Sequence, residues 1–342
     1  MDEICYFVES IERSMKILYA VQGTGNGHLC RAIDIIPCLR AFAEVDVLVS
    51  GIQADIQLPF EVKYRYHGLS FIFGKTGGVD LWKTFMSSTV RKFVKEVNAV
   101  PVEQYDLVIN DFEPISAWGS YFKEKPCIGL SHQIGAFDPA SPKPEETDML
   151  GKFIMKNYAP STHSYGFHFK SYAPHIFTPV IRQSVRQLEP RDLGHYTVYL
   201  PSYDDAHLLK QLSKFPDVKW EVFSKHNKKP FKLKNVSINP INSDAFVQSM
   251  ADSSGVLCGA GFETPAEALH LGKKLLVIPM KNQYEQHLNA ASLEEIGVPV
   301  IKSLKKKYDL EIESWLNARS RVNVDYQDCT ADIVEKIIKN HS

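Results

Sequence analysis

No apolar run in the 342-residue sequence reaches the roughly 18 residues that a membrane-spanning helix needs. The strongest short run, over residues 275–280, is interrupted by Pro279. The chain also lacks an opening secretion signal, because residues 1–14 begin with two acids and contain no long apolar stretch. Neither sign of charge is in excess: 39 Lys and Arg stand against 40 Asp and Glu, which gives no support for nucleic acid as a partner. A contact with a membrane surface stays open.

Paired cysteines are likewise missing. The six cysteines are scattered and include no Cys-x-x-Cys spacing, which argues against a disulfide framework and favours reduced thiols in a cytoplasmic protein. What the chain does have is 44% apolar and 23% charged residues, an ordinary balance for a globular protein. At roughly 150 residues per domain, its length predicts two domains.

Short β-branched runs alternate with helical patterns, which is typical of parallel α/β construction. The first unit opens with a buried strand at 17–21, shortly after Met15. Met15 is therefore a candidate for the natural start, with residues 1–14 as a loose extension. The alternation weakens over 139–190 and starts again with a strand at 196–200. We expect two similar α/β units in sequence.

A glycine-rich turn, QGTGNGH over residues 22–28, follows the first strand. Glycines let the backbone approach a ligand closely, and free N–H groups at a helix start attract negative charge. The spacing differs from the G-x-G-x-x-G of dinucleotide sites, so an NAD site has weak support. His28 is either a plain helix-start residue or a functional one, at the sheet edge where ligands gather. Pro37 is expected to kink or split the helix that follows.

A second glycine-rich segment, CGAGFETPAEALHLG over residues 258–272, has the local signals of a helix. Thr264 fits its N-cap, and Glu267 would complete a capping box. That interpretation needs no ligand, but it leaves Gly259 and Gly261 unexplained. Small residues before a helix start suit a diphosphate held by backbone N–H groups.

The spacing within and after this segment is known from one protein family. The residues that carry it, over about 30 positions, are Gly261 to Glu267, Gly272, Pro279, Glu285, Gln286, Asn289 and Ala290. They resemble the donor-binding segment of GT-B nucleotide-sugar glycosyltransferases, such as plant UDP-glucosyltransferases and the UDP-GlcNAc transferase of peptidoglycan precursor synthesis. The turn before His28 also resembles the N-terminal loop of these enzymes and of galactolipid synthases.

The resemblance implies the GT-B fold, an α/β architecture of two Rossmann-like domains whose parallel sheets face a central cleft. Residues 1–188 would form an acceptor-binding N-terminal domain, and residues 189–325 a C-terminal domain that binds the nucleotide-sugar donor. Residues 326–342 would form a C-terminal helix that packs back on the first domain. We expect a hinge near 189–194 and closure of the domains over the donor.

The resemblance also assigns donor binding to particular positions. Thr264 matches a phosphate-binding residue, Glu267 a carboxylate that binds the ribose, and Glu285 with Gln286 a pair that contacts the transferred sugar. The full set is Gly25, Gly27, Gly259, Gly261, Phe262, Thr264, Glu267, Glu285 and Gln286. The chain departs from the plant pattern at Gly259, where that pattern has a histidine, so phosphate binding should depend more on the backbone and Thr264.

In the same way, His28 matches the general base of the plant enzymes, and Asp111 matches the aspartate that orients this histidine. A histidine with a pKa near 6.5 suits proton removal from an attacking hydroxyl group at neutral pH. One base without an evident nucleophile predicts direct displacement with inversion. The chain has no Asp-x-Asp donor motif, and the helix start at Thr264 can stabilise the leaving diphosphate. We therefore expect neither a metal nor another cofactor.

Two other functions stay open: a UDP-sugar 2-epimerase of the same fold, and a non-catalytic nucleotide-sugar-binding protein. An epimerase would turn over its nucleotide sugar without an acceptor. The presence of both His28 and Asp111 weighs against a binding protein that has lost its base.

The acceptor is expected to dock on the first domain near His28, Asp111 and His132, although a buried structural role for His132 is equally open. The resemblance implies transfer of a hexose or N-acetylhexosamine, from a donor whose base is uracil, in cell-envelope or glycolipid synthesis. A lipid-linked acceptor would place this cytoplasmic protein peripherally on the inner membrane face.

Overall fold

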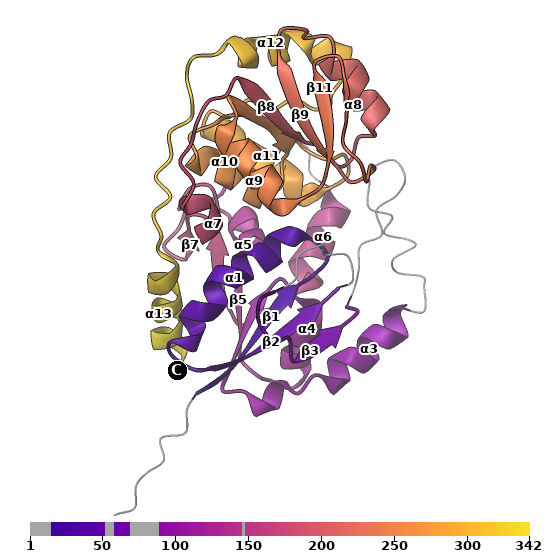
Figure 1. Cartoon of the computed structure of the whole chain (residues 1–342). Helices are drawn as coiled ribbons and strands as arrows, with labels where there is room; N and C mark the ends of the chain where they lie inside the picture. Colours follow the sequence, from indigo (N-terminus) through magenta and orange to yellow (C-terminus); the bar gives the residue numbers. More distant parts are fainter. Residues whose placement is uncertain (1–14, 52–57, 69–88, 146–147) are drawn as a thin grey trace, which may run out of the picture.

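The computed structural model describes residues 15–51, 58–68, 89–145 and 148–342, which form two α/β units stacked one above the other (Figure 1). The suggested extension at residues 1–14 lies outside the described residues. The first unit holds one sheet and the second unit another, as the alternation of strands and helices predicts.

The first sheet is parallel throughout, in the order β3-β2-β1-β4-β5-β6-β7. The interior strand β1 is buried from Ile17 to Gln22, because a strand covered by helices on both faces needs a continuous apolar run. The strand order reverses between β1 and β4, the point where open α/β sheets bind ligands. The strands are β1 (Lys16–Gln22), β2 (Glu44–Ser50), β3 (Tyr64–Tyr66), β4 (Leu107–Asp111), β5 (Cys127–Ser131), β6 (His163–Phe167) and β7 (Ile176–Phe177).

The second sheet repeats this plan in the order β10-β11-β9-β8-β12-β13. All neighbours are parallel except β10, which pairs antiparallel with β11 at the edge. The order reverses between β8 and β12. The strands are β8 (His195–Tyr199), β9 (Lys219–Ser224), β10 (Phe231–Leu233), β11 (Val236–Pro240), β12 (Gly255–Gly259) and β13 (Lys274–Ile278).

Helices cover both sheets, and several of them begin just after the carboxyl end of a strand. In the first unit they are α1 (Asn26–Arg40), α3 (Thr89–Ala99), α4 (Pro114–Phe122), α5 (His132–Phe137), α6 (Met149–Tyr158) and α7 (Gln183–Arg186), with a 3-10 turn at Val102–Gln104. In the second they are α8 (Asp205–Leu212), α9 (Ser243–Asp252), α10 (Glu263–His270), α11 (Tyr284–Glu295) and α12 (Asp309–Asn317), with a 3-10 turn at Lys306–Tyr308. The last helix, α13 (Thr330–His341), returns to the first unit and packs against α1 (Figure 1).

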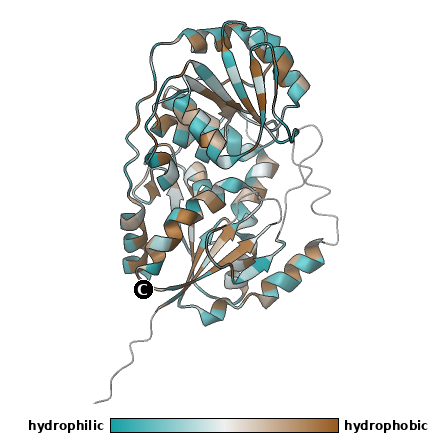
Figure 2. Cartoon of the chain, in the orientation of Figure 1, coloured by the Kyte–Doolittle hydropathy of each residue, from teal (hydrophilic) through white to brown (hydrophobic). Residues whose placement is uncertain are grey.

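The largest apolar cluster crosses the boundary between the units. It joins Tyr19 of β1 and Ile36 of α1 to Ala266 of α10 and Ile337 of α13, all fully buried. Figure 2 shows hydrophobic residues concentrated in the strands, with hydrophilic residues on the outer helix faces. A shared core of this kind packs the two units against each other in this arrangement and so shapes the space between them.

Of the two effects expected of Pro37, the split of the helix is wrong, since α1 runs as one helix from Asn26 to Arg40. Pro37 lies in the exposed last turn, where water can satisfy the carbonyl group that loses its partner. On the opposite face Ile35, Ile36 and Leu39 are buried and keep the helix on the sheet.

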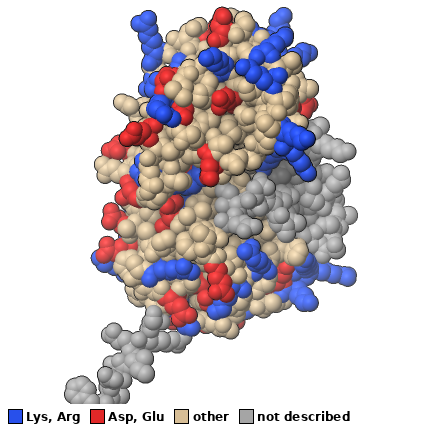
Figure 3. All heavy atoms as spheres, in the orientation of Figure 1, with Lys and Arg blue, Asp and Glu red and all other residues tan. Residues whose placement is uncertain are grey.

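The surface and the cysteines fit the composition. Figure 3 shows Lys and Arg side chains of one face spread over both units and mixed with Asp and Glu. The cysteines of the described residues, Cys30, Cys38, Cys127, Cys258 and Cys329, are all free thiols. Within the same part of the chain, no helix is both long and apolar enough to cross a bilayer.

Candidate active site

The two units face each other across a cleft of about 520 Å³. Its lining residues follow the carboxyl ends of β1, β4 and β5 in the first unit and of β8, β9, β12 and β13 in the second. In Figure 1, α1 and α5 lie below this boundary, and α10 and α11 lie above it. The cleft brings together Gly25, Gly27, His28, His132, Gly261, Phe262, Thr264, Glu267, Glu285 and Gln286 of the expected site.

The first wall is the turn between β1 and α1. Gly25 occupies the extended N-cap position of α1, so the helix begins at Asn26 and His28 lies in its first turn. No side chain caps this helix start, which leaves its first N–H groups available to an anionic ligand. Gly23 has to be glycine, because a Cβ there would lie 2.8 Å from Cγ1 of Val49.

Behind His28 lies Asp111, the last residue of β4, which is fully buried and does not line the cleft. Burial alone would raise the pKa of this carboxyl group, but Arg31 and His28 outweigh burial and hold the pKa well below its usual range. Nδ1 of His28 is 2.8 Å from Oδ1 of Asp111. An ionised carboxylate only accepts hydrogen bonds, so Nδ1 donates and Nε2 remains as an acceptor. The side-chain amide of Gln133 lies 3.2 Å from that Nε2 and can donate to it.

Arg31, one helical turn after His28, is a site residue that was not predicted from the sequence. Its side chain is fully buried and donates twice to Asp111, from Nε at 3.0 Å and from Nη2 at 2.8 Å. Nη1 donates a hydrogen bond to Oε1 of Glu263 in the second unit. The signal that could have found Arg31 is its spacing, since residues i and i+3 share a helix face.

The second wall is the start of α10, which is not capped as expected. The helix begins at Glu263, and the residue at its N-cap position, Phe262, makes no side-chain hydrogen bond. Thr264 therefore lies within the first turn, and the predicted capping box between Thr264 and Glu267 is wrong. The physical reason is a competing partner: Arg182 donates to both carboxylate oxygens of Glu267, at 2.5 and 2.8 Å. The first N–H groups of α10 are consequently left without a side-chain cap.

Arg182 is a second cation that the sequence analysis missed. It precedes α7 and lines the cleft, while its partner Glu267 is almost fully buried. Two parallel charge-assisted hydrogen bonds fix both the position and the plane of a carboxylate. Glu267, which the resemblance places at the ribose, is thus held by Arg182, and Arg182 also lines the cleft.

Glu263 reaches from the second unit across the boundary to α1. Its side chain passes over Gly27, where a Cβ would lie 2.9 Å from Cγ of Glu263. Burial raises the pKa of Glu263 to about 8, and the nearby Glu267 and Asp111 add to this shift while Arg31 opposes it. Gly27 therefore has a use that the resemblance does not imply: it leaves room for a carboxyl group of the other unit.

The two residues expected at the transferred sugar start α11. Glu285 lies 2.9 Å from Nε2 of His132 and accepts from Gln133 at 3.2 Å, both on α5. Burial lowers the pKa of His132 to about 4, although Glu285 opposes this shift. The ring is then neutral at pH 7 and donates from Nε2 to Glu285. Gln286 accepts from the backbone N–H of Met280 at 2.8 Å.

His132 also has a packing contact, since its ring stacks on Phe262 with centroids 4.8 Å apart. It thus touches the second unit through both Phe262 and Glu285. Gly259, the last residue of β12, does not line the cleft; a Cβ there would lie 3.4 Å from Oε1 of Gln286. The donor roles of Gly259 and the other expected residues, the catalytic roles of His28 and Asp111, and the acceptor role of His132 all stay predictions.

The far end of the cleft has an aromatic wall that the sequence analysis did not identify. The ring centroid of Phe246 lies 5.4 Å from that of Tyr199 and 5.3 Å from that of Phe223, and all three residues line the cleft. They come from α9 and from the ends of β8 and β9, so no short motif connects them. Flat aromatic faces of this kind suit a nucleobase.

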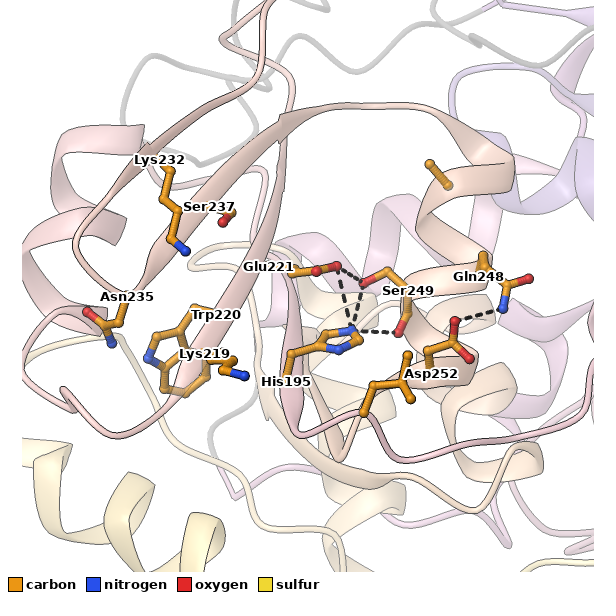
Figure 4. A pocket seen from close by; sticks show the side chains of 12 residues that line it. His195, Lys219, Trp220, Glu221, Lys232, Asn235, Ser237, Gln248, Ser249 and Asp252 are labelled. Atoms are coloured by element: carbon orange, nitrogen blue, oxygen red, sulfur yellow. Dashed lines mark hydrogen bonds and ion pairs between the residues drawn. The ribbon is translucent and has the colours of Figure 1, made fainter.

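A second cavity, of about 590 Å³, lies at the opposite, amino ends of β8, β9 and β11 (Figure 4). There the Ser249 hydroxyl group donates to Glu221 at 2.8 Å, and Nε2 of His195 donates to the backbone oxygen of Ser249 at 3.0 Å. These polar groups satisfy one another, and the cavity is remote from both glycine-rich helix starts. We therefore place the active site in the cleft, where the carboxyl ends of the strands meet.

Comparisons with known proteins give the family and the fold. Residues 15–318 match the model of the family described as glycosyl transferase family 1. The glycosyltransferase SnogD from Streptomyces nogalater is 15% identical, with a TM-score of 0.54, and the match covers 96% of each chain. MurG of Acinetobacter baumannii is 13% identical with a TM-score of 0.53, over 94% of this chain and 99% of that one.

The glycosyltransferase SsfS6 from Streptomyces sp. SF2575, solved with thymidine diphosphate, is 14% identical with a TM-score of 0.54, over 95% of this chain and 99% of that one. No curated protein matches the chain. The structural matches confirm the predicted GT-B fold.

Proposed function

Because the chain belongs to glycosyl transferase family 1, we propose that it transfers a sugar from a nucleotide-sugar donor, a UDP-sugar, to a hydroxyl group of an acceptor. The observation that carries the proposal is the pair of His28 and Asp111. The imidazole lines the cleft between the units, and its Nδ1 is bonded to a fully buried carboxylate. A hydroxyl group that attacks a sugar carbon needs a base of this kind at this place.

In the reaction, the acceptor oxygen forms a bond to the anomeric carbon as the bond to the nucleoside diphosphate breaks. Nε2 of His28 takes the hydroxyl proton, and Asp111 stabilises the imidazolium that forms. A single displacement of this type inverts the configuration at the anomeric carbon. The proton and the leaving group thus depart on opposite sides of the sugar.

The donor occupies the second unit. Its diphosphate sits at the uncapped start of α10 near Gly261 and Thr264, where helix N–H groups and the cation Arg182 supply positive charge. This charge makes transfer independent of a metal ion. Glu267 binds the ribose, and Glu285 with Gln286 binds the sugar.

The uracil base stacks on the aromatic wall at the far end of the cleft. The transferred sugar is a hexose or an N-acetylhexosamine, and its hydroxyl groups meet Glu285 where that carboxylate already faces the first unit.

The acceptor has an apolar part, in keeping with a lipid-linked substrate of cell-envelope or glycolipid synthesis. The support is α6, on which Met149, Leu150 and Phe153 are 71%, 57% and 67% exposed. The same helix ends at Tyr158, whose hydroxyl group contacts Gln22 at the cleft. An acceptor held there would bring this cytoplasmic protein to the inner membrane face.

The first experiment compares thermal unfolding with UDP, GDP, ADP, dTDP and NAD. A ligand at 100 times its Kd adds about 2.7 kcal/mol, worth several degrees in Tm for domains of this size. We expect a shift with UDP. A shift with NAD alone would contradict the proposal.

The second experiment separates the enzyme classes. His28→Ala should lower sugar transfer by about 100-fold or more while the Kd for UDP stays within about twofold. Unchanged turnover would remove His28 from the role of base. Rapid conversion of the nucleotide sugar without an acceptor would instead identify an epimerase, and UDP binding without any turnover a binding protein.

A further inference from the structure

Arg31 connects the proposed base of the first unit to a carboxyl group of the second. Its side chain has no exposed surface and does not line the cleft, so it cannot touch a substrate. Whatever Arg31 contributes to the reaction must therefore pass through its neighbours. Those neighbours are Asp111 and Glu263, on opposite sides of the boundary, and the rings of His28 and His132, whose Nδ1 atoms lie 3.1 and 3.3 Å from Nη2 of Arg31.

On the first side, Arg31 fixes the plane of the Asp111 carboxylate. Nε donates to Oδ2 and Nη2 to Oδ1, the oxygen that also accepts from Nδ1 of His28. Two-point contact of a guanidinium group with a carboxylate leaves little rotational freedom. The direction of the Asp111 lone pairs, and with it the orientation of the His28 ring, depends on where Arg31 is held.

On the second side, the remaining nitrogen of Arg31 is held by Glu263, the first residue of α10. The glycine at position 27 permits this contact, because a Cβ there would lie 2.9 Å from Cγ of Glu263. Glu263 immediately precedes Thr264, at the helix start where the proposed function places the diphosphate. The contact between Glu263 and Arg31 therefore connects the start of α10, on the donor side of the cleft, to Asp111, which lies behind His28.

The geometry points to Arg31 as a positioning residue that makes the orientation of His28 depend on α10 lying closed over α1. When the units are together, Glu263 holds Arg31, Arg31 holds Asp111, and Asp111 keeps the proton of His28 on Nδ1. When the units part, Arg31 loses its contact with Glu263, so Asp111 and the ring of His28 are held less firmly. The functional consequence rests on the proposed role of His28 as base; the coupling itself does not.

The test uses the full chain with ¹⁵N-labelled histidine, at a pH where the His28 ring is neutral. The ring nitrogen shifts report the fraction of His28 with its proton on Nδ1, and the loss of signals in His28→Gln assigns them. Glu263→Leu removes the acceptor of Arg31. Glu263→Gln keeps an oxygen at that place and serves as the conservative rescue. Asp309→Asn, which removes a carboxylate from a pair with Lys214 far from the cleft, is the matched control.

We expect the Nδ1–H fraction to fall from about nine tenths in the wild type to about one half in Glu263→Leu. Glu263→Gln and Asp309→Asn should stay near the wild type. Gly27→Ala leaves every charged group in place but crowds Glu263, so it should resemble Glu263→Leu. Combining these two changes should give no further effect, because both act through one contact.

A wild-type fraction in Glu263→Leu would overturn the inference, as would an equal loss in Glu263→Gln. If Glu263→Leu fails to fold, Gly27→Ala alone decides, and a wild-type fraction there refutes the coupling. The measurement needs neither donor nor acceptor. Sugar transfer and its loss in His28→Ala test the proposed function separately, so either idea can fail without the other.

Discussion

Protonation of Glu263 should add a pH-dependent contribution to the free energy of unfolding in the neutral range. Burial, with Glu267 and Asp111 nearby, raises its pKa to about 8 from an ordinary value of 4.5. The folded protein then holds this proton more tightly than the unfolded chain does. The resulting stabilisation is fully present below 4.5 and is lost as the pH rises through about 8.

The magnitude follows from the two pKa values. The pKa of Glu263 is 4.5 in the unfolded chain and about 8 in the folded protein. Proton linkage then lowers the free energy of unfolding by about 2 kcal/mol between pH 6 and pH 8, which corresponds to about 4–8 °C in Tm. His132 and His168 act in the opposite direction, because burial lowers their pKa to about 4 and about 3. Their stabilisation is present above the unfolded pKa and lost as the pH falls, so each adds about 1 kcal/mol from pH 6 to pH 8.

The wild-type curve alone would therefore be nearly flat and uninformative. The measurement is the difference in Tm between the wild type and Glu263→Gln at pH 6, 7 and 8, since both proteins share the histidine contributions. The wild type should lose about 2 kcal/mol relative to the variant over this range. Parallel curves would refute the reasoning, because they would mean that Glu263 stays ionised beside Arg31 at every pH tested.

Three further substitutions test other parts of the site and fold. Arg182→Ala should raise the Kd for UDP, measured by calorimetry, by about tenfold. The substitution removes both hydrogen bonds that orient Glu267. An unchanged Kd would remove Glu267 from the donor site. Asp111→Asn should lower sugar transfer by about 100-fold with the Kd for UDP unchanged, and a normal rate would show that the base needs no carboxylate. Gly135→Ala should destabilise the fold by about 1–3 kcal/mol or prevent folding, since its Cβ would lie 2.1 Å from the backbone oxygen of Phe167. An unchanged melting curve would contradict that estimate.

The strands and their parallel arrangement could be predicted because buried strands leave a local signal. The expected strand at 17–21 is β1 (Lys16–Gln22), and the one at 196–200 is β8 (His195–Tyr199), one residue earlier. A strand covered on both faces is a continuous apolar run whatever its neighbours are. The glycine-rich turns were equally visible, since they follow β1 and β12 directly, where each strand order reverses.

The local signals failed where a distant residue competes for a side chain. Thr264 and Glu267 have the spacing of a capping box, but Arg182, 85 positions before Glu267, takes the carboxylate instead. Two charge-assisted hydrogen bonds from one guanidinium group outweigh the single hydrogen bond that this carboxylate would accept from a helix N–H group. No spacing rule within the segment can show that such a cation lies nearby.

The same limit applies with more force across the cleft. Arg31 and Glu263 are 232 positions apart, and His132 and Glu285 are 153 apart. Each pair exists only because the two sheets meet across the cleft in this arrangement, packed by the shared core. Sequence patterns reflect the local requirements of one helix or strand. They therefore predicted the glycine-rich turn before α1 and the start of α10, but not the contacts between the two units.

These contacts leave room for a donor. A carboxylate has about four lone-pair sites, and the two bonds from Arg182 use one on each oxygen of Glu267. Glu285 likewise accepts once on each oxygen, from His132 and Gln133. Each carboxylate thus keeps about two lone pairs for sugar hydroxyl groups while its direction is fixed by partners that a ligand need not displace. Under the proposed function, closure of the units and binding of the donor are therefore compatible in a single state, and the closed arrangement orients the carboxylate oxygens of Glu267 and Glu285 before the donor arrives.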